Sequence, residues 1–361
     1  MKILFISRAT LYKDKGGDTV QVLNTAKFLE KLGIEVDIRL CNETIDYTSF
    51  DLIHFFNIIR PADILLHIKK SRKPFVVSTI FVDYSEYEKK ERKGLAGLIF
   101  RTFSPDTIEY VKAIARSLIS QEKIISPEYL WLGHRKAVQK IIREASLLLP
   151  NSKNEYHRLV GHFKVESSYR VIPNAIDPEL FVVTTTNDRN ERLVLCVGRI
   201  EGRKNQLNLI RALNNTPYEL ILIGAASPNQ ANYYEECKKL AGANVKFIPA
   251  LEQQQLLAYY SRAKVHALPS WFETTGLSSL EAGAMGCNIV ISDKGDTRDY
   301  FENNAFYCDP ASPASILGTI KAAAASNIKG KLRERILKKY TWSETAKKTL
   351  EAYHEVLKDT H

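Results

Sequence analysis

Short apolar runs alternate with amphipathic stretches along the chain, and this alternation is the strongest constraint on its fold. Lys2 to Ser7 is a continuous apolar run, and the helical pattern of apolar positions that follows it closes at Gly33. The same alternation resumes with the apolar run from Leu193 to Val197. Continuous apolar strands separated by helices are typical of parallel sheets that are covered on both faces. The sequence therefore predicts an α/β protein with doubly wound sheets.

The size and charge of the chain limit what it can be. Its 361 residues suffice for two domains, and 45% hydrophobic and 25% charged residues are typical of a globular protein. No apolar run is long enough to predict a membrane span, and the first run is too short for a secretory signal. Five scattered cysteines without a CxxC pair argue against a metal or redox motif and favour the cytoplasm. The net charge of +10 favours an anionic partner: nucleic acid, a phosphorylated substrate or the inner face of a membrane.

Residues 268–282 place two carboxylates around the start of a predicted helix. A strand ends at Pro269 and a helix of small residues begins near Gly276, with Glu273 between them and Glu281 inside the helix. Backbone N–H groups at a helix start have no intrahelical partners, so this loop could hold a diphosphate. The carboxylates could accept hydrogen bonds from sugar hydroxyls. The alternative is two solvated glutamates, but the small apolar residues after Glu281 argue against a solvent-facing helix.

Cations follow the predicted strand that ends at Val197. Gly198 permits a tight exit from the strand, and Arg199 and Lys204 come next in the loop. Ligands of open α/β sheets bind at the carboxyl ends of the strands, and both side chains can bind phosphate oxygens there. Two solvated loop cations are the alternative in so basic a protein. Together with the two glutamates of residues 268–282, the phosphate-binding interpretation is favoured.

The first half of the chain offers weaker candidates. Gly16 and Gly17 lie between the first strand and the first helix, where a glycine backbone can approach a ligand closely, although the full GxGxxG pattern is absent. A flexible turn is the alternative. Asp83 follows the strand that begins near Phe75 and could bind an acceptor hydroxyl, or simply form a turn. Ser152 and Glu155 have the spacing of a helix capping box.

Two segments have a distinctive composition. Residues 86–146 are helical and basic, with apolar positions flanked by lysine and arginine, which suits a helix on an anionic membrane surface. An ordinary core-packing helix with a solvated basic face is the alternative. Residues 184–192 are polar without periodicity and are predicted to be a linker.

Taken together, these motifs resemble the GT-B retaining glycosyltransferases of family 4. The resemblance is carried by Gly198-Arg199-Ile200 with Lys204-Asn205, by Pro269-Ser270, and by Glu273 followed seven residues later by Glu281-Ala282. The similarity runs from Ile3 to the terminal helix. It implies a Rossmann-like acceptor-side domain at 1–177, a Rossmann-like nucleotide-sugar domain at 178–341, and a last helix at 342–361 that packs back on the first domain.

The resemblance also implies roles for individual residues. Arg199 and Lys204 match the cations that bind the diphosphate, Glu273 matches the glutamate beside the donor sugar, and Glu281 matches the one that holds the ribose. Arg199, Lys204 and Glu273 are thus the implied catalytic residues. The further donor-binding residues it implies are Gly16, Gly17, Gly198, Thr275, Gly276 and Leu277.

One position departs from the family pattern. Many members carry a histidine after the strand that corresponds to Val76–Thr79, next to the reacting sugar, whereas this chain reads Ile80-Phe81-Val82-Asp83. A backbone carbonyl, Asp83 or His54 could serve instead. His54 lies in an apolar run and is equally readily interpreted as a core histidine.

The resemblance implies transfer of a hexose-type sugar, with retention, from a UDP- or GDP-sugar to a glycan or lipid-linked acceptor. Neither a metal nor another cofactor is expected. The expected setting is synthesis of a bacterial surface polysaccharide such as lipopolysaccharide, in the cytoplasm or at the inner face of the membrane. A nucleotide-sugar epimerase is one alternative. A non-catalytic basic protein that binds nucleotides or nucleic acid is another, but no nucleic-acid motif is present.

Overall fold

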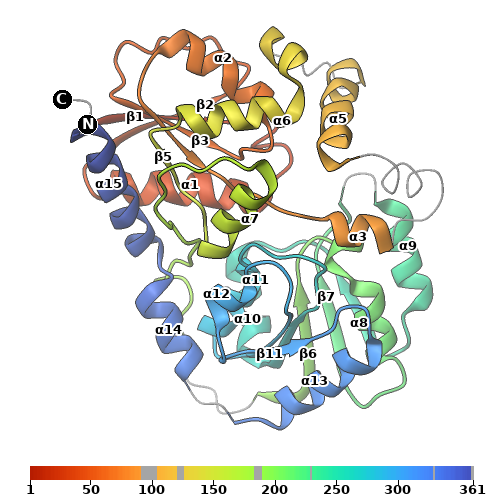
Figure 1. Cartoon of the computed structure of the whole chain (residues 1–361). Helices are drawn as coiled ribbons and strands as arrows, with labels where there is room; N and C mark the ends of the chain where they lie inside the picture. Colours follow the sequence, from red (N-terminus) through yellow and green to blue (C-terminus); the bar gives the residue numbers. More distant parts are fainter. Residues whose placement is uncertain (91–103, 120–125, 183–188, 228–229, 328–329, 359–361) are drawn as a thin grey trace. The chain divides into compact units, whose positions relative to one another are not determined.

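The computed structural model describes the chain apart from residues 91–103, 120–125, 183–188, 228–229, 328–329 and 359–361 (Figure 1). The chain forms two compact units. Unit 1 comprises residues 1–81, 92–174 and 342–361, and unit 2 comprises residues 82–91 and 175–341. Neither unit is one continuous stretch of sequence. The division differs from the predicted boundaries, because the short segment Val82–Glu91 groups with unit 2.

Unit 1 is built on a parallel sheet with the strand order β2-β1-β3-β4-β5 among its described residues. Its strands are β1 (Lys2–Ser7), β2 (Glu35–Leu40), β3 (Leu52–Phe56), β4 (Phe75–Ser78) and β5 (Leu147–Leu148). Its described helices are α1 (Gly17–Glu30), α2 (Pro61–Ser71), α5 (Pro105–Ile119), α6 (Pro127–Glu144), α7 (Lys153–Phe163) and α15 (Trp342–Lys358).

Unit 2 repeats this architecture with the strand order β11-β10-β9-β6-β7-β8. Its strands are β6 (Asn190–Val197), β7 (Glu219–Ile223), β8 (Val245–Ile248), β9 (Ala263–Leu268), β10 (Asn288–Ser292) and β11 (Phe306–Cys308). Its described helices are α3 (Ser85–Lys90), the 3₁₀ turn η1 (Gly202–Lys204), α8 (Gln206–Leu213), α9 (Ala231–Leu240), α10 (Gln253–Arg262), α11 (Leu277–Ala284), α12 (Thr297–Phe301), α13 (Pro313–Ala325) and α14 (Lys331–Lys339).

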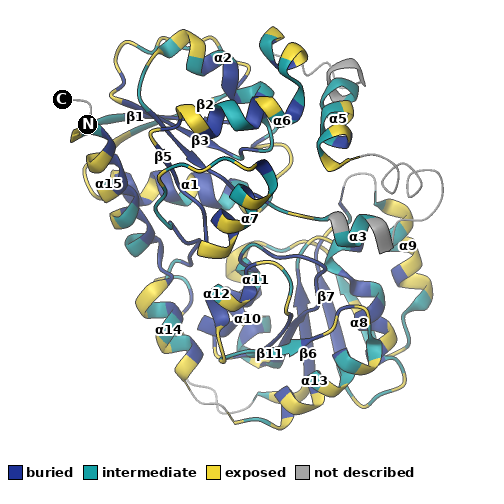
Figure 2. Cartoon of the chain, viewed as in Figure 1, coloured by how far each residue is buried: buried dark blue, intermediate teal, exposed yellow. Residues whose placement is uncertain are grey.

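The central strands of both sheets are buried on both faces (Figure 2). The five residues of β3 are all buried, and β9 is buried over nearly its whole length. Helices cover the two faces of each sheet, so every central strand needs apolar side chains on both sides. This explains why the strands appear in the sequence as continuous apolar runs. The predicted doubly wound α/β fold is confirmed.

The predicted linker at 184–192 differs from the structure at its end. Strand β6 already begins at Asn190, where the backbone pairs with Ala263 of β9. The first residues of β6 are exposed and polar, so the apolar pattern that predicts the strand begins only at Leu193. Most of the linker lies outside the described residues.

The last helix belongs to unit 1, where α15 packs against α1 (Figure 1). Its Tyr353 is fully buried, and the Tyr353 hydroxyl lies 2.7 Å from Nδ1 of His54 on β3. Nε2 of the same ring lies 2.8 Å from the Ser78 hydroxyl. Burial lowers the pKa of His54 to about 3, so the ring is neutral at physiological pH. Helix α15 therefore supplies the hydrogen-bond partner of a buried histidine on β3, although the two residues are 299 positions apart in the sequence.

We expect Tyr353→Phe to destabilise unit 1 by about 1–3 kcal/mol, because Nδ1 of His54 would remain buried without its partner. Urea unfolding followed by circular dichroism measures the change. Tyr307→Phe is a matched control, because the Tyr307 hydroxyl donates 2.7 Å to the Glu302 carbonyl at an exposed site, where water can replace it. Equal free energies of unfolding for the two variants would contradict this account of α15.

Candidate functional site

A lysine and a glutamate from two neighbouring strand ends form an ion pair in unit 2. Lys204 lies in η1 after β6, Glu273 lies in the loop after β9, and their Nζ and Oε1 atoms are 2.6 Å apart. Strands β6 and β9 are adjacent and parallel, so their carboxyl ends meet at one edge of the sheet. Burial disfavours the charge of Lys204, but the Glu273 carboxylate more than offsets this and the pKa of Lys204 is raised. The site therefore holds a permanent cation.

The backbone fixes the loop that carries Glu273. The N–H of Trp271 donates to the Arg203 carbonyl at 2.9 Å, which joins the loops after β9 and β6. The Glu273 carbonyl accepts the Asp296 N–H at 2.8 Å. Gly295 adopts φ +76°, and a Cβ atom there would collide with the backbone of Glu273. Only glycine allows this close approach of the loop after β10.

Further charges surround the ion pair. Glu201 is almost fully buried, its carboxylate lies 3.1 Å from the guanidinium of Arg203 and 3.9 Å from that of Arg199, and it accepts the Ser227 hydroxyl at 2.7 Å. Burial disfavours the charge of Glu201, but the neighbouring arginines, Arg203 foremost, more than offset this and lower its pKa. With Lys204 and Glu273 the loops bring together three cations and two carboxylates, and these five side chains together carry one net positive charge.

The segment Val82–Glu91 contributes an aromatic side chain to this cluster. The Tyr84 ring lies 4.2 Å from the guanidinium carbon of Arg203 and packs edge-on against Phe272, with 5.8 Å between the ring centroids. In the same segment the Glu86 carboxylate lies 2.8 Å from the ammonium of Lys294. Burial raises the pKa of Tyr84, so its hydroxyl stays protonated. The segment thus covers one side of the cations.

Helix α11 begins next to Glu273, as predicted. Gly276 is its N-cap residue with φ +72°, Leu277 is its first residue, and Thr275 before them is buried. The Gly276 carbonyl accepts the N–H groups of Ser279 and Leu280, which closes the first helical turn. The N–H groups of Leu277 and Ser278 make no hydrogen bond within the described part of the chain. They are the donors that a bound anion would meet.

Glu281 lies in a second network on α11. Its Oε1 accepts from the Gln253 amide at 2.8 Å and its Oε2 from the Tyr260 hydroxyl at 2.9 Å, both on α10. Glu281 is only 9% exposed, and burial raises its pKa despite these two donors. The structure therefore keeps a desolvated carboxylate at the helix, as predicted from its small apolar neighbours. Its partners on α10 were not predicted.

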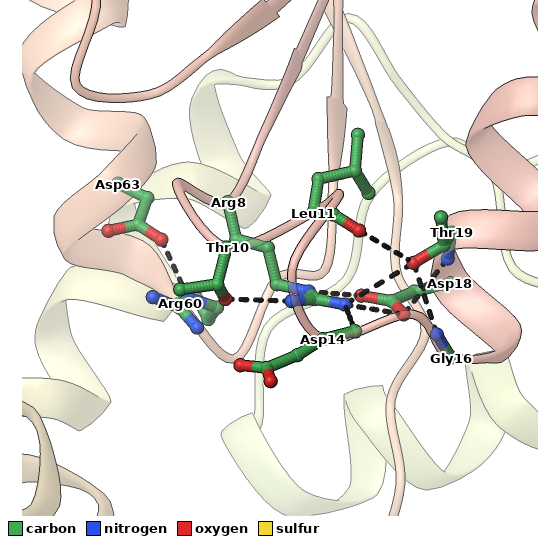
Figure 3. A network of polar contacts seen from close by, with 9 residues as sticks. All are labelled: Arg8, Thr10, Leu11, Asp14, Gly16, Asp18, Thr19, Arg60 and Asp63. Atoms are coloured by element: carbon green, nitrogen blue, oxygen red, sulfur yellow. Dashed lines mark hydrogen bonds and ion pairs between the residues drawn. The ribbon is translucent and has the colours of Figure 1, made fainter.

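In unit 1 the first loop is shaped by Arg8 (Figure 3). Its guanidinium bonds to the Asp18 carboxylate at 2.6 Å, to the Thr10 hydroxyl at 2.7 Å and to the Asp14 carbonyl at 2.6 Å. Gly16 is the N-cap residue of α1 and Gly17 its first residue. The predicted glycine pair thus lies at the start of α1, at the end of a loop whose backbone and side chains are hydrogen-bonded to Arg8.

Three predicted residues have less direct placements. Gly198 directly follows β6, and its N–H donates to the Ile223 carbonyl at 3.0 Å. Asp83 is exposed and lies in the segment that groups with unit 2, not with the acceptor-side domain as predicted. His54 is buried with both ring nitrogens hydrogen-bonded, so the structure favours a core histidine and gives it no route to an acceptor.

Comparison with known proteins identifies unit 2. Residues 181–341 match the family described as Glycosyl transferases group 1. Unit 2 therefore carries a group 1 glycosyltransferase domain. The resemblance predicted from the spacing of the cations and carboxylates is confirmed.

Two of the curated relatives described next align over most of the chain. A probable sucrose-phosphate synthase of Thermosipho melanesiensis is 23% identical, and the alignment covers 95% of this chain and 92% of that protein. An N-acetylgalactosamine-N,N'-diacetylbacillosaminyl-diphospho-undecaprenol 4-alpha-N-acetylgalactosaminyltransferase of Campylobacter jejuni is 25% identical, over 82% of this chain and 83% of that protein. The alignment with an uncharacterized glycosyltransferase of Methanocaldococcus jannaschii, at 26% identity, spans 52% of this chain and 54% of that protein.

A solved structure shows the same fold. Anabaena HepE in complex with UDP-glucose superposes with a TM-score of 0.71 at 17% identity, over 98% of this chain and 100% of that chain. At this identity the likeness concerns the fold, which is of the GT-B type.

Several residues of the site were not predicted to act there. Arg203 and Glu201 stand between predicted residues, but loop charges alone do not show which of them face one another. Tyr84 is separated from Arg203 by more than a hundred residues. The sequence signal that could have drawn attention to this segment is its cluster of two tyrosines and two glutamates, Tyr84-Ser85-Glu86-Tyr87-Glu88.

The buried carboxylate of Glu281 predicts a pH-dependent stability. A carboxyl group whose pKa is raised on folding contributes stability at low pH, and this contribution is lost as the pH rises from the ordinary value near 4.5 through the raised one. Glu281→Gln cannot ionise. We therefore expect its melting temperature to exceed that of the parent protein at pH 7.5 and the difference to shrink towards pH 4.5.

Glu236→Gln on the exposed side of α9 is the control, because an exposed carboxylate pays little for its charge. Differential scanning fluorimetry across the pH range gives both differences. A Glu281→Gln advantage that is independent of pH would contradict the assignment of the cost to ionisation.

We expect Arg8→Ala to loosen the first loop of unit 1. Charged hydrogen bonds of this kind contribute about 1–3 kcal/mol, and the variant loses several of them at once. Hydrogen exchange followed by mass spectrometry is expected to show faster exchange in residues 10–19 and no change in β3. Arg60→Ala, which removes an ion pair with Asp63 outside this loop, is the matched control (Figure 3). Equal protection of the loop in both variants would count against the role of Arg8.

Proposed function

We propose that this glycosyltransferase moves a hexose-type sugar from a UDP- or GDP-sugar to a glycan or lipid-linked acceptor, with retention of the anomeric configuration. The observation that carries the proposal is the Lys204–Glu273 pair beside the start of α11, with Arg199 and Arg203 in the same cluster. The complex of HepE with UDP-glucose supports a nucleotide-sugar donor for this fold.

The charges suit a leaving diphosphate. When the glycosyl bond breaks, negative charge grows on the phosphate oxygens, and cations already in place need no reorganisation to stabilise it. Arg199 and Lys204 supply the cations, and the N–H groups of Leu277 and Ser278 supply donors. We propose that these groups carry the charge without a metal ion. Removing one such contact costs about 10²–10³ in rate where the contact matures in the transition state.

The two glutamates suit the neutral parts of the donor. In this proposal Glu273, oriented by Lys204, accepts a hydroxyl of the donor sugar, and Glu281 accepts ribose hydroxyls. A ribose would then replace the amide of Gln253 or the hydroxyl of Tyr260 as the donor to Glu281. In this view a bound substrate offsets part of the energetic cost of burying Glu281.

The acceptor side is proposed from weaker support. The Campylobacter jejuni relative carries diphospho-undecaprenol in its name, which supports a lipid-linked acceptor and a role in surface polysaccharide synthesis at the inner face of the membrane. Trp131 on α6 is 91% exposed and Leu130 beside it 46% exposed, which supports peripheral contact of the basic 86–146 region with an anionic membrane. Parts of that region, 91–103 and 120–125, lie outside the described residues. None of the described helices is long and apolar enough to span a bilayer.

A thermal-shift screen with UDP-glucose, UDP-galactose, UDP-N-acetylglucosamine and GDP-mannose identifies the donor, because a ligand that binds only the folded state raises the melting temperature. We expect Lys204→Met to lower release of the nucleotide diphosphate from that donor by about 10²–10³. Lys204→Met with Glu273→Gln keeps the pair neutral, should the single variant not fold. Proton NMR of the transferred sugar reports retention.

Lys238→Met on α9, where the lysine is exposed, is the matched control and is expected to behave like the parent protein. No thermal shift with any donor, or unchanged turnover in the Lys204 variants, would refute the proposal.

A further inference from the structure

The buried carboxylate of Glu155 in unit 1 has a role beyond capping its own helix. Glu155 lies on the first turn of α7 and is fully buried. The Ser152 hydroxyl accepts the Glu155 N–H at 2.9 Å, which is one half of the predicted capping box. The other half is different, because the carboxylate accepts the N–H of Asn151, at 2.9 Å, and not that of Ser152. The other carboxylate oxygen of Glu155 accepts hydrogen bonds from a different segment.

The second oxygen of Glu155 holds the turn after β4. It accepts the Phe81 N–H at 2.8 Å and the hydroxyl of Thr79. The opposite sides of the same two residues are also held: Arg158 donates to the Phe81 carbonyl at 2.8 Å, and the Ile58 N–H donates to the Thr79 carbonyl at 3.0 Å. Two side chains of α7 therefore hold the turn: Glu155 bonds to Thr79 and Phe81, and Arg158 bonds to Phe81.

Ile80, between these two residues, is in a strained conformation. Its φ is +45°, in the left-handed region that a β-branched residue rarely adopts. Such a conformation costs on the order of 1–3 kcal/mol and persists only where the surroundings enforce it. The bonds to Thr79 and Phe81 are what enforce it here. Strain of this kind is concentrated at sites where a backbone group has to be presented to a ligand.

The peptide groups of Ile80 are available for a ligand. Within the described residues, neither its N–H nor its C=O makes a hydrogen bond, and Ile80 is only partly buried. It lies directly after the carboxyl end of β4, the edge at which open parallel sheets bind ligands.

The same carboxylate is connected to the first loop. The Gln21 side chain on α1 donates to Oδ1 of Asn151 at 2.9 Å, and the Asn151 N–H donates to Glu155. Helix α1 begins at Gly17, directly after the loop that Arg8 holds. Buried polar groups thus tie the turn after β4 to the helix that follows β1.

We propose that Glu155 is a positioning residue, which holds the Ile80 peptide in place to hydrogen-bond a hydroxyl of the substrate sugar. This inference rests on the proposed function. Glu155 itself is sealed from solvent and touches no substrate; it acts through the turn. The hydroxyl belongs either to the donor sugar or to the acceptor, and the two cases differ in the steps that they affect.

Glu155→Gln tests the proposal, because an amide has one acceptor oxygen and leaves at least one of the N–H and O–H donors unpaired. We expect release of nucleotide diphosphate to fall about 10- to 100-fold, the scale on which small misplacements act. Affinity for free UDP or GDP, measured calorimetrically, is expected to stay within twofold. Loss of both hydrolytic and acceptor-stimulated release assigns the hydroxyl to the donor, and loss of acceptor-stimulated release alone assigns it to the acceptor.

Ser152→Ala is the matched control, because it removes the cap of the same helix and leaves the carboxylate and the turn intact. Thr79→Val, which deletes one bond to Glu155 at nearly constant volume, replaces Glu155→Gln if that variant does not fold. Release at the parental rate in the folded Glu155 or Thr79 variant, or an equal loss in Ser152→Ala, overturns the proposal. A parent protein that binds and turns over no nucleotide sugar is a failure of the proposed function instead.

Discussion

A carboxylate that is withdrawn from water has to be matched by donors or cations, and this requirement shapes the loops at the carboxyl ends of both sheets. Glu273 is matched by Lys204 and Glu201 by two arginines, so the loops after β6 and β9 are tied together. Glu281 is matched by neutral donors on α10, and Glu155 by the turn after β4. In each case the partner comes from another segment, so satisfying the charge also places a loop.

These matches are of two kinds. The carboxylate of Glu273 raises the pKa of the buried Lys204 and keeps the lysine charged, which suits a site that has to hold phosphate. Burial raises the pKa of Glu281, and its two neutral donors, the Gln253 amide and the Tyr260 hydroxyl, only partly offset this cost. Under the proposed function, Lys204 and its neighbouring arginines meet the charge of the sugar nucleotide, and the carboxylates of Glu273 and Glu281 meet its hydroxyl groups.

Much of this arrangement could be predicted from the sequence. Apolar runs without alternation identify parallel strands, and parallel strands bring their following loops to one edge of the sheet. Lys204 and Glu273, which are 69 positions apart in the sequence, were therefore both expected at that edge. The helix start at Gly276 was also readable, because small residues follow it. The placement of His54 was left open, since an apolar run fits a core histidine and a site histidine equally well.

What could not be predicted is which distant segments meet. Nothing in the sequence around Tyr84 indicates that its ring contacts the guanidinium of Arg203. The spacing of Ser152 and Glu155 suggests a helix cap, and it gives no sign that the Glu155 carboxylate bonds to another segment. The left-handed backbone at Ile80 is likewise invisible, because isoleucine is among the residues least expected there. Periodicity reports which face of an element is buried, but the partner on that face is a property of the tertiary structure.

The position of α15 has a consequence for the order in which the protein matures. Domains generally fold as units during synthesis, the first one translated before the next. Here the unit that contains the first residue also contains the last helix, and the nitrogen of His54 meets the hydroxyl of Tyr353. The ribosome therefore translates residues 175–341 of unit 2 before it reaches Tyr353. Unit 1, whose strands β1 to β5 are made before unit 2, is thus completed only after unit 2 has been made.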